Sequence, residues 1–391
     1  MADAAPVYFA DAFYDGQFAR TLYKAYAGAA DLGEAFATAR RLGPKAADPD
    51  RWHDGWRAMA DAVASSAESR DRVGARDSYL RASEYYRQAY FFLRGDLDDM
   101  RLHDAYERHV ETFAAAVAMM DHPAAAVRIP YEGTTLHGFL YAPAGDATPR
   151  GTVLMPCGYD STAEEGWAFV PDALARGFRV LVFEGPGQGE ALMVRHLTFR
   201  PDFENVLTPV IDWLEAQPDD PGPLILFGRS FAGYLAPRAA TREHRLAALV
   251  CDPAQPDMGA HLPKGVAGKV AGPAVSTMMR MSRNRAEFFR SRMATHGVTD
   301  PGAYFAELRA FTMLDDAGLI TCPTLLVESE HDPVGGGGPV LYDALTCPKE
   351  LVRLTAAQGV DGHCGGLGQQ VWADTVYGWL DRQLAARPVA A

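Results

Sequence analysis

The chain has 391 residues, 48% hydrophobic and 22% charged, which suits one large or two medium globular domains. Its formal net charge of −13 makes nucleic acid an unexpected partner, and no apolar run approaches the roughly 18 residues that a membrane-spanning helix needs. The N-terminal segment lacks the basic residues of a signal peptide, and the five cysteines form no CxxC pair. We therefore expect a cytoplasmic protein with reduced thiols, no disulfide framework and no zinc site.

Residues 1–122 show the hydrophobic periods of amphipathic helices, and we expect them to form a helical N-terminal domain. Three apolar faces can be recognised, at residues 52–63, 79–93 and 106–117. The simplest explanation for their aromatic residues is packing in the core of that domain. A second possibility is that Tyr85 and Tyr86 look into a substrate cleft.

The pattern changes at Ala124, after which short apolar strands alternate with helical segments. The first two expected strands, at 127–131 and 136–141, lie on either side of Glu132-Gly133 and form a hairpin. Further strand candidates are 152–155, 179–183, 224–227, 247–251, 324–328 and 351–354. Helix candidates are 163–176, 205–217, 232–241, 340–345 and 368–384. This alternation predicts an α/β catalytic domain over residues 123–391, with a mostly parallel sheet and helices on both faces.

One stretch of about residues 253–317 interrupts the alternation, because it contains no clear strand. It holds six of the chain's 13 methionines, and we expect it to form a helical cap above the sheet. Methionine-rich surfaces adapt to varied apolar ligands, so Met278 and Met281 are candidates for lining the substrate site. The alternative is that these methionines pack only the cap's own small core.

The segment LILFGRSFAGY predicts a buried strand, a sharp turn and a helix, with Ser230 at the turn. A serine at such a corner can present its hydroxyl above the sheet, the arrangement called a nucleophile elbow. Gly228 and Ala232 are small enough to let strand and helix approach closely, although Ala232 stands where the motif usually has glycine. We expect Gly228 and Arg229 to support the corner. The alternative is an ordinary strand–helix turn with a surface serine.

A serine becomes a good nucleophile only when a base takes its proton and a carboxylate orients that base. At an elbow of this kind the partners follow in the order acid, then histidine. Asp332 follows the strand at 324–328, and His363 lies between the final strand and the final helix. We predict a triad of Ser230, Asp332 and His363. The competing residues near the same strand are Glu328, Glu330 and His331.

Acyl chemistry also needs hydrogen-bond donors for the oxyanion that develops on the substrate. The backbone N–H of Phe231, directly after the nucleophile, is one expected donor. The other should come from the loop after the first central strand, where Gly158 lets the backbone turn inward and the N–H of Tyr159 is our candidate. Cys157 is a weaker candidate for the nucleophile, because no base partner marks it.

These motifs resemble a known group of enzymes. Residues 124–385 resemble an α/β-hydrolase. More specific segments are FEGPGQGE (183–190), GRSFAGY (228–234), the pair His363-Cys364 and the helical segment LRASEYYRQAYFF (80–92). Together they are similar to the subgroup that contains 2,6-dihydroxypseudooxynicotine hydrolase and the fungal hydrolases that shorten heptaketides on the way to melanin-type pigments. Glu184 departs from that subgroup's motif, in which Asp-Gly usually precedes PGQGE.

The resemblance implies an α/β-hydrolase fold with an N-terminal helical domain over the active site, a Ser-Asp-His triad, a homodimer, and cleavage of a carbon–carbon bond next to a ketone. We therefore expect a serine hydrolase for a small, partly apolar ketone, β-diketone or ester in secondary metabolism, with no cofactor and no metal. The alternatives are a broad carboxylesterase or thioesterase, an acyl-transfer or cyclising enzyme, and a catalytically silent hydrolase-fold protein that binds a ligand.

Overall fold

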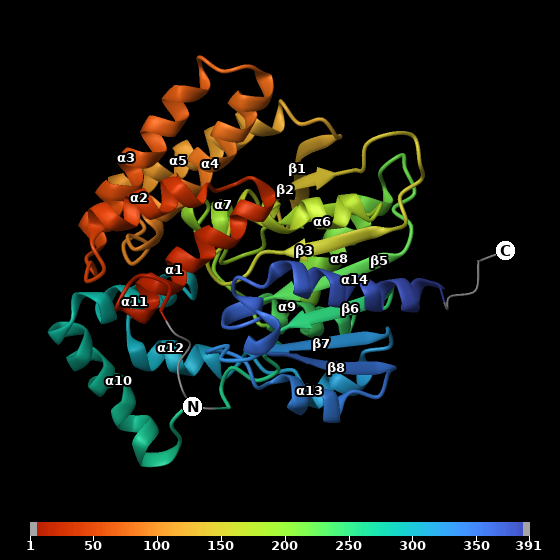
Figure 1. The fold of residues 1–391 in the computed structure, drawn as a ribbon. Coiled ribbons are helices and arrows are strands. Elements are labelled where there is room, and N and C mark those ends of the chain that lie inside the picture. The colour runs from red at the N-terminus through yellow and green to blue at the C-terminus, as the bar shows by residue number, and fades with distance from the viewer. Residues whose placement is uncertain (1–5, 261, 386–391) are drawn as a thin grey trace.

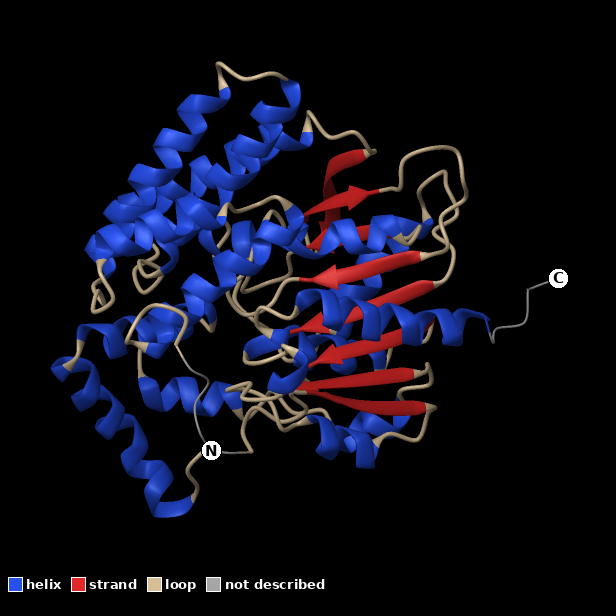
Figure 2. Cartoon of the chain, in the orientation of Figure 1, coloured by secondary structure: helices blue, strands red, loops and turns tan. Residues whose placement is uncertain are grey.

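The computed structural model describes residues 6–260 and 262–385, so the outermost residues of both predicted domains lie outside the described part. Figure 2 shows the division of the molecule into a helical end and a sheet end. No helix among the described residues has the length and apolar character needed to cross a membrane.

The described strands form one eight-stranded sheet in the order β1-β2-β4-β3-β5-β6-β7-β8. They are β1 (Ala124–Tyr131), β2 (Thr134–Tyr141), β3 (Thr152–Pro156), β4 (Arg179–Phe183), β5 (Leu224–Arg229), β6 (Leu246–Asp252), β7 (Thr324–Ser329) and β8 (Lys349–Leu354). β2 pairs antiparallel with β1 and β4, and the other neighbours pair in parallel. β3, β4, β6 and β7 are buried at every position, because helices cover both faces of a mostly parallel sheet.

The two faces of the sheet carry separate hydrophobic clusters. One cluster contains residues of α8 (Glu204–Glu215), α9 (Ala232–Ala240) and α13 (Gly338–Ala344). The other contains residues of α6 (Val170–Ala175) and α14 (Gln369–Ala385). The prediction of an α/β fold with a mostly parallel, doubly covered sheet is confirmed.

The N-terminal region is helical, as predicted, and the five α-helices described between residues 6 and 122 all begin in the same way. They are α1 (Ala12–Tyr23), α2 (Leu32–Leu42), α3 (Pro49–Ala67), α4 (Arg72–Phe91) and α5 (Met100–Val117), and a 3-10 helix, η1 (Lys24–Ala27), follows α1. An aspartate precedes each α-helix, and its carboxylate accepts a hydrogen bond from an amide of the first turn. Such caps satisfy amides that have no partner within the helix. The capping residues are Asp11, Asp31, Asp48, Asp71 and Asp99.

Between β6 and β7 the chain leaves the sheet and forms the cap. Its helices are α10 (Gly265–Met281), α11 (Arg283–Thr295) and α12 (Pro301–Leu308), followed by the 3-10 helix η3 (Leu314–Leu319). Figure 1 shows that both the N-terminal helices and the cap lie beyond the carboxyl ends of the parallel strands. The two regions touch: the rings of Phe13 and Phe288 are 5.4 Å apart, and Arg283 forms a 2.7 Å ion pair with Asp50.

Candidate active site

Ser230 lies at the corner between β5 and α9, with its backbone in the left-handed region at φ 56°. The corner is tight, since a Cβ added at Gly228 would lie 2.3 Å from the carbonyl oxygen of Ala232. Ala232 itself is fully buried, so the small side chain that departs from the usual motif fits here. The amide of Ser230 donates to the carbonyl of Asp252 at 2.8 Å, which ties the corner to the end of β6.

His363 connects Ser230 to a buried carboxylate. Its Nε2 lies 2.8 Å from Oγ of Ser230, and its Nδ1 lies 2.9 Å from Oδ1 of Asp332. The second oxygen of Asp332 accepts the amide of Cys364 at 3.0 Å, which fixes the carboxylate relative to the histidine loop. Serine, imidazole and carboxylate are therefore in line, at the distances that proton transfer from a serine requires.

Asp332 and His363 shift each other's pKa values in opposite directions. Burial alone would raise the pKa of Asp332, but His363 and hydrogen bonds from the amides of Cys364 and Val334 lower it below its usual value. Burial alone would lower the pKa of His363, but Cys364 and the Asp332 carboxylate raise it well above its usual value. Asp332 is consequently ionised at neutral pH and stabilises a protonated His363.

The predicted oxyanion donors lie on either side of the serine. A Cβ added at Gly158 would lie 3.2 Å from Cβ of Ser230, so the loop after β3 lies against the Ser230 corner. The rings of Tyr159 and Phe231 are 4.9 Å apart. Within the described residues, neither the Tyr159 amide nor the Phe231 amide donates a hydrogen bond to a protein acceptor. Both N–H groups are therefore available for an oxyanion.

The PGQGE segment after β4 holds the other side of this loop. Gln188 donates from its amide nitrogen to the carbonyls of Cys157, at 2.5 Å, and Gly158, at 3.1 Å. Glu184, which departs from the expected motif, is fully buried and accepts the amide of Ala163 at 3.0 Å. Burial and the nearby Glu164 raise the pKa of Glu184 to about 7. These contacts support the loop and do not reach Ser230.

Arg229, which we expected to support the serine corner, contacts the histidine loop. Its guanidinium donates to the carbonyl of Cys364 at 2.7 Å and to Oε1 of Gln369 at 2.9 Å. It also lies over the rings of Phe169 and Trp372, at 4.1 and 4.0 Å from their centroids. Contacts with the two rings help to hold the guanidinium in place.

One residue beside Ser230 and His363 was not found by sequence reasoning. Asp252, at the end of β6, is fully buried, and burial raises its pKa to about 6. Its carbonyl accepts both the Ser230 amide and, at 3.2 Å, the Cys364 thiol. The position of Asp252 after a predicted strand was the signal that could have identified it, because parallel strands end at one edge of the sheet.

Asp332, His363 and Cys364 present possible metal ligands within 4.8 Å of one another, but hydrogen bonds already engage both nitrogens of His363.

An aromatic wall adjoins the oxyanion loop. The ring of Tyr159 lies 5.1 Å from Phe199 and 5.6 Å from His296 of the cap, and His296 lies 5.1 Å from Phe311. His296 is 6% exposed, burial lowers its pKa to about 4, and neither ring nitrogen has a hydrogen-bond partner among the described residues. Sequence reasoning did not identify His296, because nothing in its local pattern distinguishes it from other histidines.

The residues predicted to line the substrate site are not brought together with Ser230. Tyr85 is fully buried in the helical core, where its hydroxyl donates to Glu34 at 2.8 Å. The hydroxyl of Tyr86 donates to Asp61 at 2.6 Å, and Arg57 lies over its ring. The helical region's own packing therefore accounts for both tyrosines. Met281 is 83% exposed at the end of α10, and Met278 on the same helix is half-buried.

The competing residues are engaged elsewhere. His331 pairs with Asp361 at 2.8 Å. Both carboxylate oxygens of Glu328 accept backbone amides of the glycine-rich loop, and Glu330 accepts the Ala356 amide at 2.7 Å. Burial raises the pKa of Cys157 well above its usual value, so its thiol stays protonated and unreactive.

Along the chain the serine comes first, then the acid, then the histidine, which is the order found in hydrolases with a nucleophile elbow. Comparison with known proteins shows the family. The chain belongs to the alpha/beta hydrolase family, whose model matches residues 152–386, and it is an enzyme of the hydrolase class.

Known relatives resemble the chain over nearly its whole length. It is 30% identical to hydrolase acrC of Aspergillus aculeatus (95% of this chain, 96% of the relative) and 32% identical to the alpha/beta hydrolase psoB of Aspergillus fumigatus (97% and 90%). It is 35% identical to 20-hydroxy-prefusarin hydrolase of Gibberella moniliformis over 62% of this chain and 61% of that protein. The crystal structure of 2,6-dihydroxy-pseudo-oxynicotine hydrolase shares the fold, with a TM-score of 0.73 at 21% identity over 94% of this chain and 97% of that one.

Proposed function

We propose that the protein is a serine hydrolase that cleaves a carbon–carbon bond next to a carbonyl in a small, partly apolar ketone or β-diketone of secondary metabolism. The observation that carries the proposal is the continuous hydrogen-bonded line from Ser230 through His363 to Asp332. The sequence resemblance supports the carbon–carbon chemistry, and the similarity to 20-hydroxy-prefusarin hydrolase supports a role in secondary metabolism.

The proposed reaction begins when Oγ of Ser230 attacks the substrate carbonyl while His363 takes its proton. The oxyanion forms against the amides of Tyr159 and Phe231. Collapse of the tetrahedral intermediate breaks the bond to the adjacent carbon, which leaves as an enolate and receives the proton from His363. Water, activated by His363, then hydrolyses the acyl-serine and releases an acid. A variant of this route has His363 activate water directly, without an acyl-serine.

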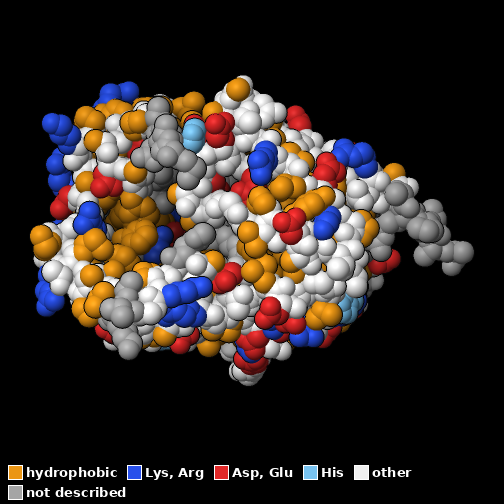
Figure 3. All heavy atoms as spheres, turned by 90° about the horizontal axis from the view of Figure 1, so that it is seen from below, with side chains coloured by type: hydrophobic (Ala, Val, Ile, Leu, Met, Phe, Trp, Pro, Cys, Tyr) orange, Lys and Arg blue, Asp and Glu red, His pale blue; other side chains and the backbone are white. Residues whose placement is uncertain are grey.

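The aromatic wall supports a flat and largely apolar substrate. Tyr159 and Phe231 contribute both an oxyanion amide and an aromatic ring, so a bound carbonyl would bring its attached group against those rings. Seen from below, the cap end of the molecule is hollowed, and hydrophobic side chains gather in the hollow (Figure 3). Apolar, concave surfaces of this kind are typical of small-molecule sites.

The test is a product screen by mass spectrometry with β-diketones, acylated phenols and simple esters in ¹⁸O-labelled water. We expect β-diketones to give one labelled acid and one unlabelled ketone, because water adds across the broken carbon–carbon bond. The Ser230→Ala variant is the control for uncatalysed cleavage. Cleavage of esters alone would replace the proposal with a carboxylesterase, and no cleavage together with no fluorophosphonate labelling would indicate a silent binding protein.

The rate should also depend on the charge of His363. The base must be neutral to accept the serine proton, and its pKa is raised above the ordinary value of about 6.5. Since protonation removes the base, we expect kcat/KM to fall with decreasing pH along a limb centred above about 6.5. Because the Asp332 carboxylate raises the pKa of His363, the activity that remains in Asp332→Asn should fall at a lower pH than that of the wild type. A flat profile from pH 5 to 8 would argue against a histidine base.

A further inference from the structure

The loop after β3, residues 157–165, carries three acidic residues besides the proposed oxyanion amide. Asp160 directly follows Tyr159, and Glu164 and Glu165 lie at the start of the 3-10 helix η2 (Glu165–Phe169). The side chains of Glu164 and Glu165 are 0% and 3% exposed, so their charges need partners inside the protein. Most of the partners of this loop come from the N-terminal helical region.

Arg20 of α1 is the central contact. Its Nη1 lies 2.6 Å from Oδ1 of Asp160, while its Nε and Nη2 each lie 2.5 Å from one oxygen of Glu165. The guanidinium therefore forms a two-pronged bond to Glu165 and a third bond to Asp160. Paired bonds of this kind fix direction as well as distance, which a single point charge does not. Arg20 consequently holds the residue next to Tyr159.

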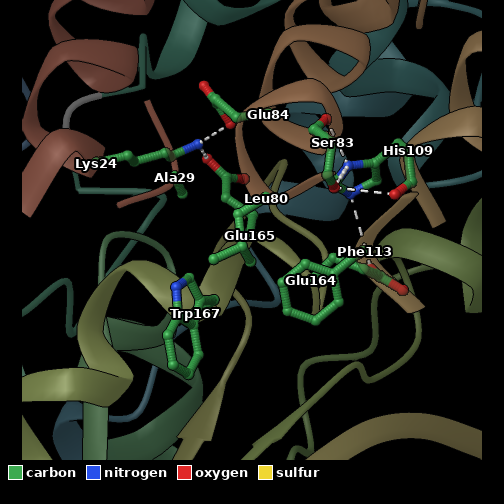
Figure 4. A pocket seen from close by; sticks show the side chains of 10 residues that line it. All are labelled: Lys24, Ala29, Leu80, Ser83, Glu84, His109, Phe113, Glu164, Glu165 and Trp167. Carbon is green, nitrogen blue, oxygen red and sulfur yellow. Dashed lines mark hydrogen bonds and ion pairs between the residues drawn. The ribbon is translucent and has the colours of Figure 1, made fainter. Parts of the chain in front are cut away.

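A second layer of buried charges holds the same loop from behind (Figure 4). The ammonium of Lys24 lies between Glu84 of α4 and Glu165, and pairs with Glu165 at 2.5 Å. Arg87 of α4 pairs with Glu84 at 3.0 Å and approaches Glu165 to 3.5 Å. None of these four side chains is more than 3% exposed. Lys24, Glu84 and Glu165 line a small cavity between the helical region and the loop.

Other residues of the loop contact both sides. On the hydrolase side, Ala163 donates its amide to Glu184, and Oε1 of Glu164 lies 3.0 Å from Nε2 of His137 in β2. His109 of α5 contacts the Thr162 hydroxyl with Nε2 at 2.8 Å and the Ser83 hydroxyl with Nδ1 at 2.8 Å. Arg94, after α4, approaches Asp160 to 3.6 Å. The loop is therefore held between Gln188 on the hydrolase side and the N-terminal helices on the other.

We propose that the N-terminal helical region holds the oxyanion loop in its working position, and that Arg20 is the positioning residue for the Tyr159 amide. This inference rests on the proposed function. An oxyanion donor acts only when it is fixed where the charge develops, and a shift of about 1 Å can cost on the order of 10²-fold in rate. The loop has no regular secondary structure before η2, so its contacts determine where the amide lies.

The experiment compares three variants with a matched control. Arg20→Met removes the charge and keeps an unbranched side chain. Arg20→Lys keeps the charge but cannot form the paired bonds of a guanidinium. Asp160→Asn removes the charge of the partner. Arg81→Met is the control. The side chain of Arg81 is 14% exposed, close to the 16% of Arg20, and Arg81 also forms an ion pair, with Glu34 at 2.9 Å, but within the helical region and away from the loop. Each variant is checked for its circular dichroism and melting temperature. The readouts are kcat and KM on an activated ester, and the inhibition constant of a trifluoromethyl ketone, whose tetrahedral adduct carries an oxyanion.

We expect Arg20→Met to lower kcat by about 10²-fold with KM nearly unchanged, and to weaken the trifluoromethyl ketone by the same factor. Arg20→Lys should recover part of that loss, Asp160→Asn should lose about tenfold, and Arg81→Met should behave as the wild type. Folded Arg20→Met enzyme with wild-type kcat and inhibition would overturn the inference. If Arg20→Met does not fold, wild-type kcat in Asp160→Asn would overturn it. Failure of the wild type to react with a fluorophosphonate at Ser230 would instead overturn the proposed function.

Discussion

Ser230→Ala is expected to abolish turnover, with a loss on the order of 10⁴-fold or more, and His363→Ala should lose a similar amount. Residues of a triad act as a unit, so removing one of them forfeits most of what all three contribute. The hydroxyl and imidazole are 2.8 Å apart. The Cys364 thiol lies 3.6 Å from Nε2 of His363, but burial raises its pKa and keeps it protonated. Steady-state rates on the substrate found in the product screen measure the effect.

Two controls distinguish a loss of catalysis from a loss of folding. Both variants should keep the wild-type melting temperature within a few degrees, because Ser230 and His363 are partly exposed and neither fills the core. A fluorophosphonate should label the wild type and fail to label Ser230→Ala. Near-normal turnover by Ser230→Ala would remove the serine from the mechanism and leave His363 as the activator of water.

Gly233→Ala is expected to lower both the stability of the protein and its activity. A Cβ at Gly233, in the first turn of α9, would lie 1.9 Å from the carbonyl oxygen of Pro253. This neighbour is backbone, so either α9 or the segment after β6 must move. Overpacking of this kind costs about 1–3 kcal/mol. Because the Gly233 amide donates to the Ser230 carbonyl at 2.8 Å, kcat should fall as well. Urea denaturation and steady-state kinetics measure the two effects.

Gly378→Ala is the matched control, since Gly378 also lies in a helix, α14, but has no atom within 4 Å of an added Cβ. Alanine favours the helix over glycine by about 0.5–1 kcal/mol, so Gly378→Ala should be neutral or stabilising and should leave kcat unchanged. Equal unfolding free energies for the two variants would show that α9 can move aside without cost.

Much of the fold follows from local patterns. The central strands of the parallel sheet contain continuous apolar runs, and each strand predicted from the sequence overlaps a strand of the structure. Ser230, Asp332 and His363 could be placed because each follows a strand, and parallel strands end at one edge. Their catalytic roles remain a prediction. α3, α4 and α5 follow the three predicted apolar faces.

The less predictable features depend on contacts between distant segments. No individual helix was assigned at α1 and α2, although Asp11 and Asp31 stand at their starts as caps. The partners of Tyr85 could not be read from its helix, since Glu34 lies about 50 residues away along the chain. The contact of Arg20 with Asp160 joins positions 140 residues apart and has no local signature.

The shared core of the sheet and the N-terminal helices limits how this chain can be recombined. The cluster on the α6 and α14 side of the sheet includes Leu80 of α4 together with Phe113 and Ala116 of α5. A boundary drawn near residue 123 would therefore divide a hydrophobic core as well as a set of buried ion pairs. Exchanging the helical half with that of a relative would require matched changes in β2, in α6 and in the loop after β3. The helical half and the sheet half are consequently one packing unit.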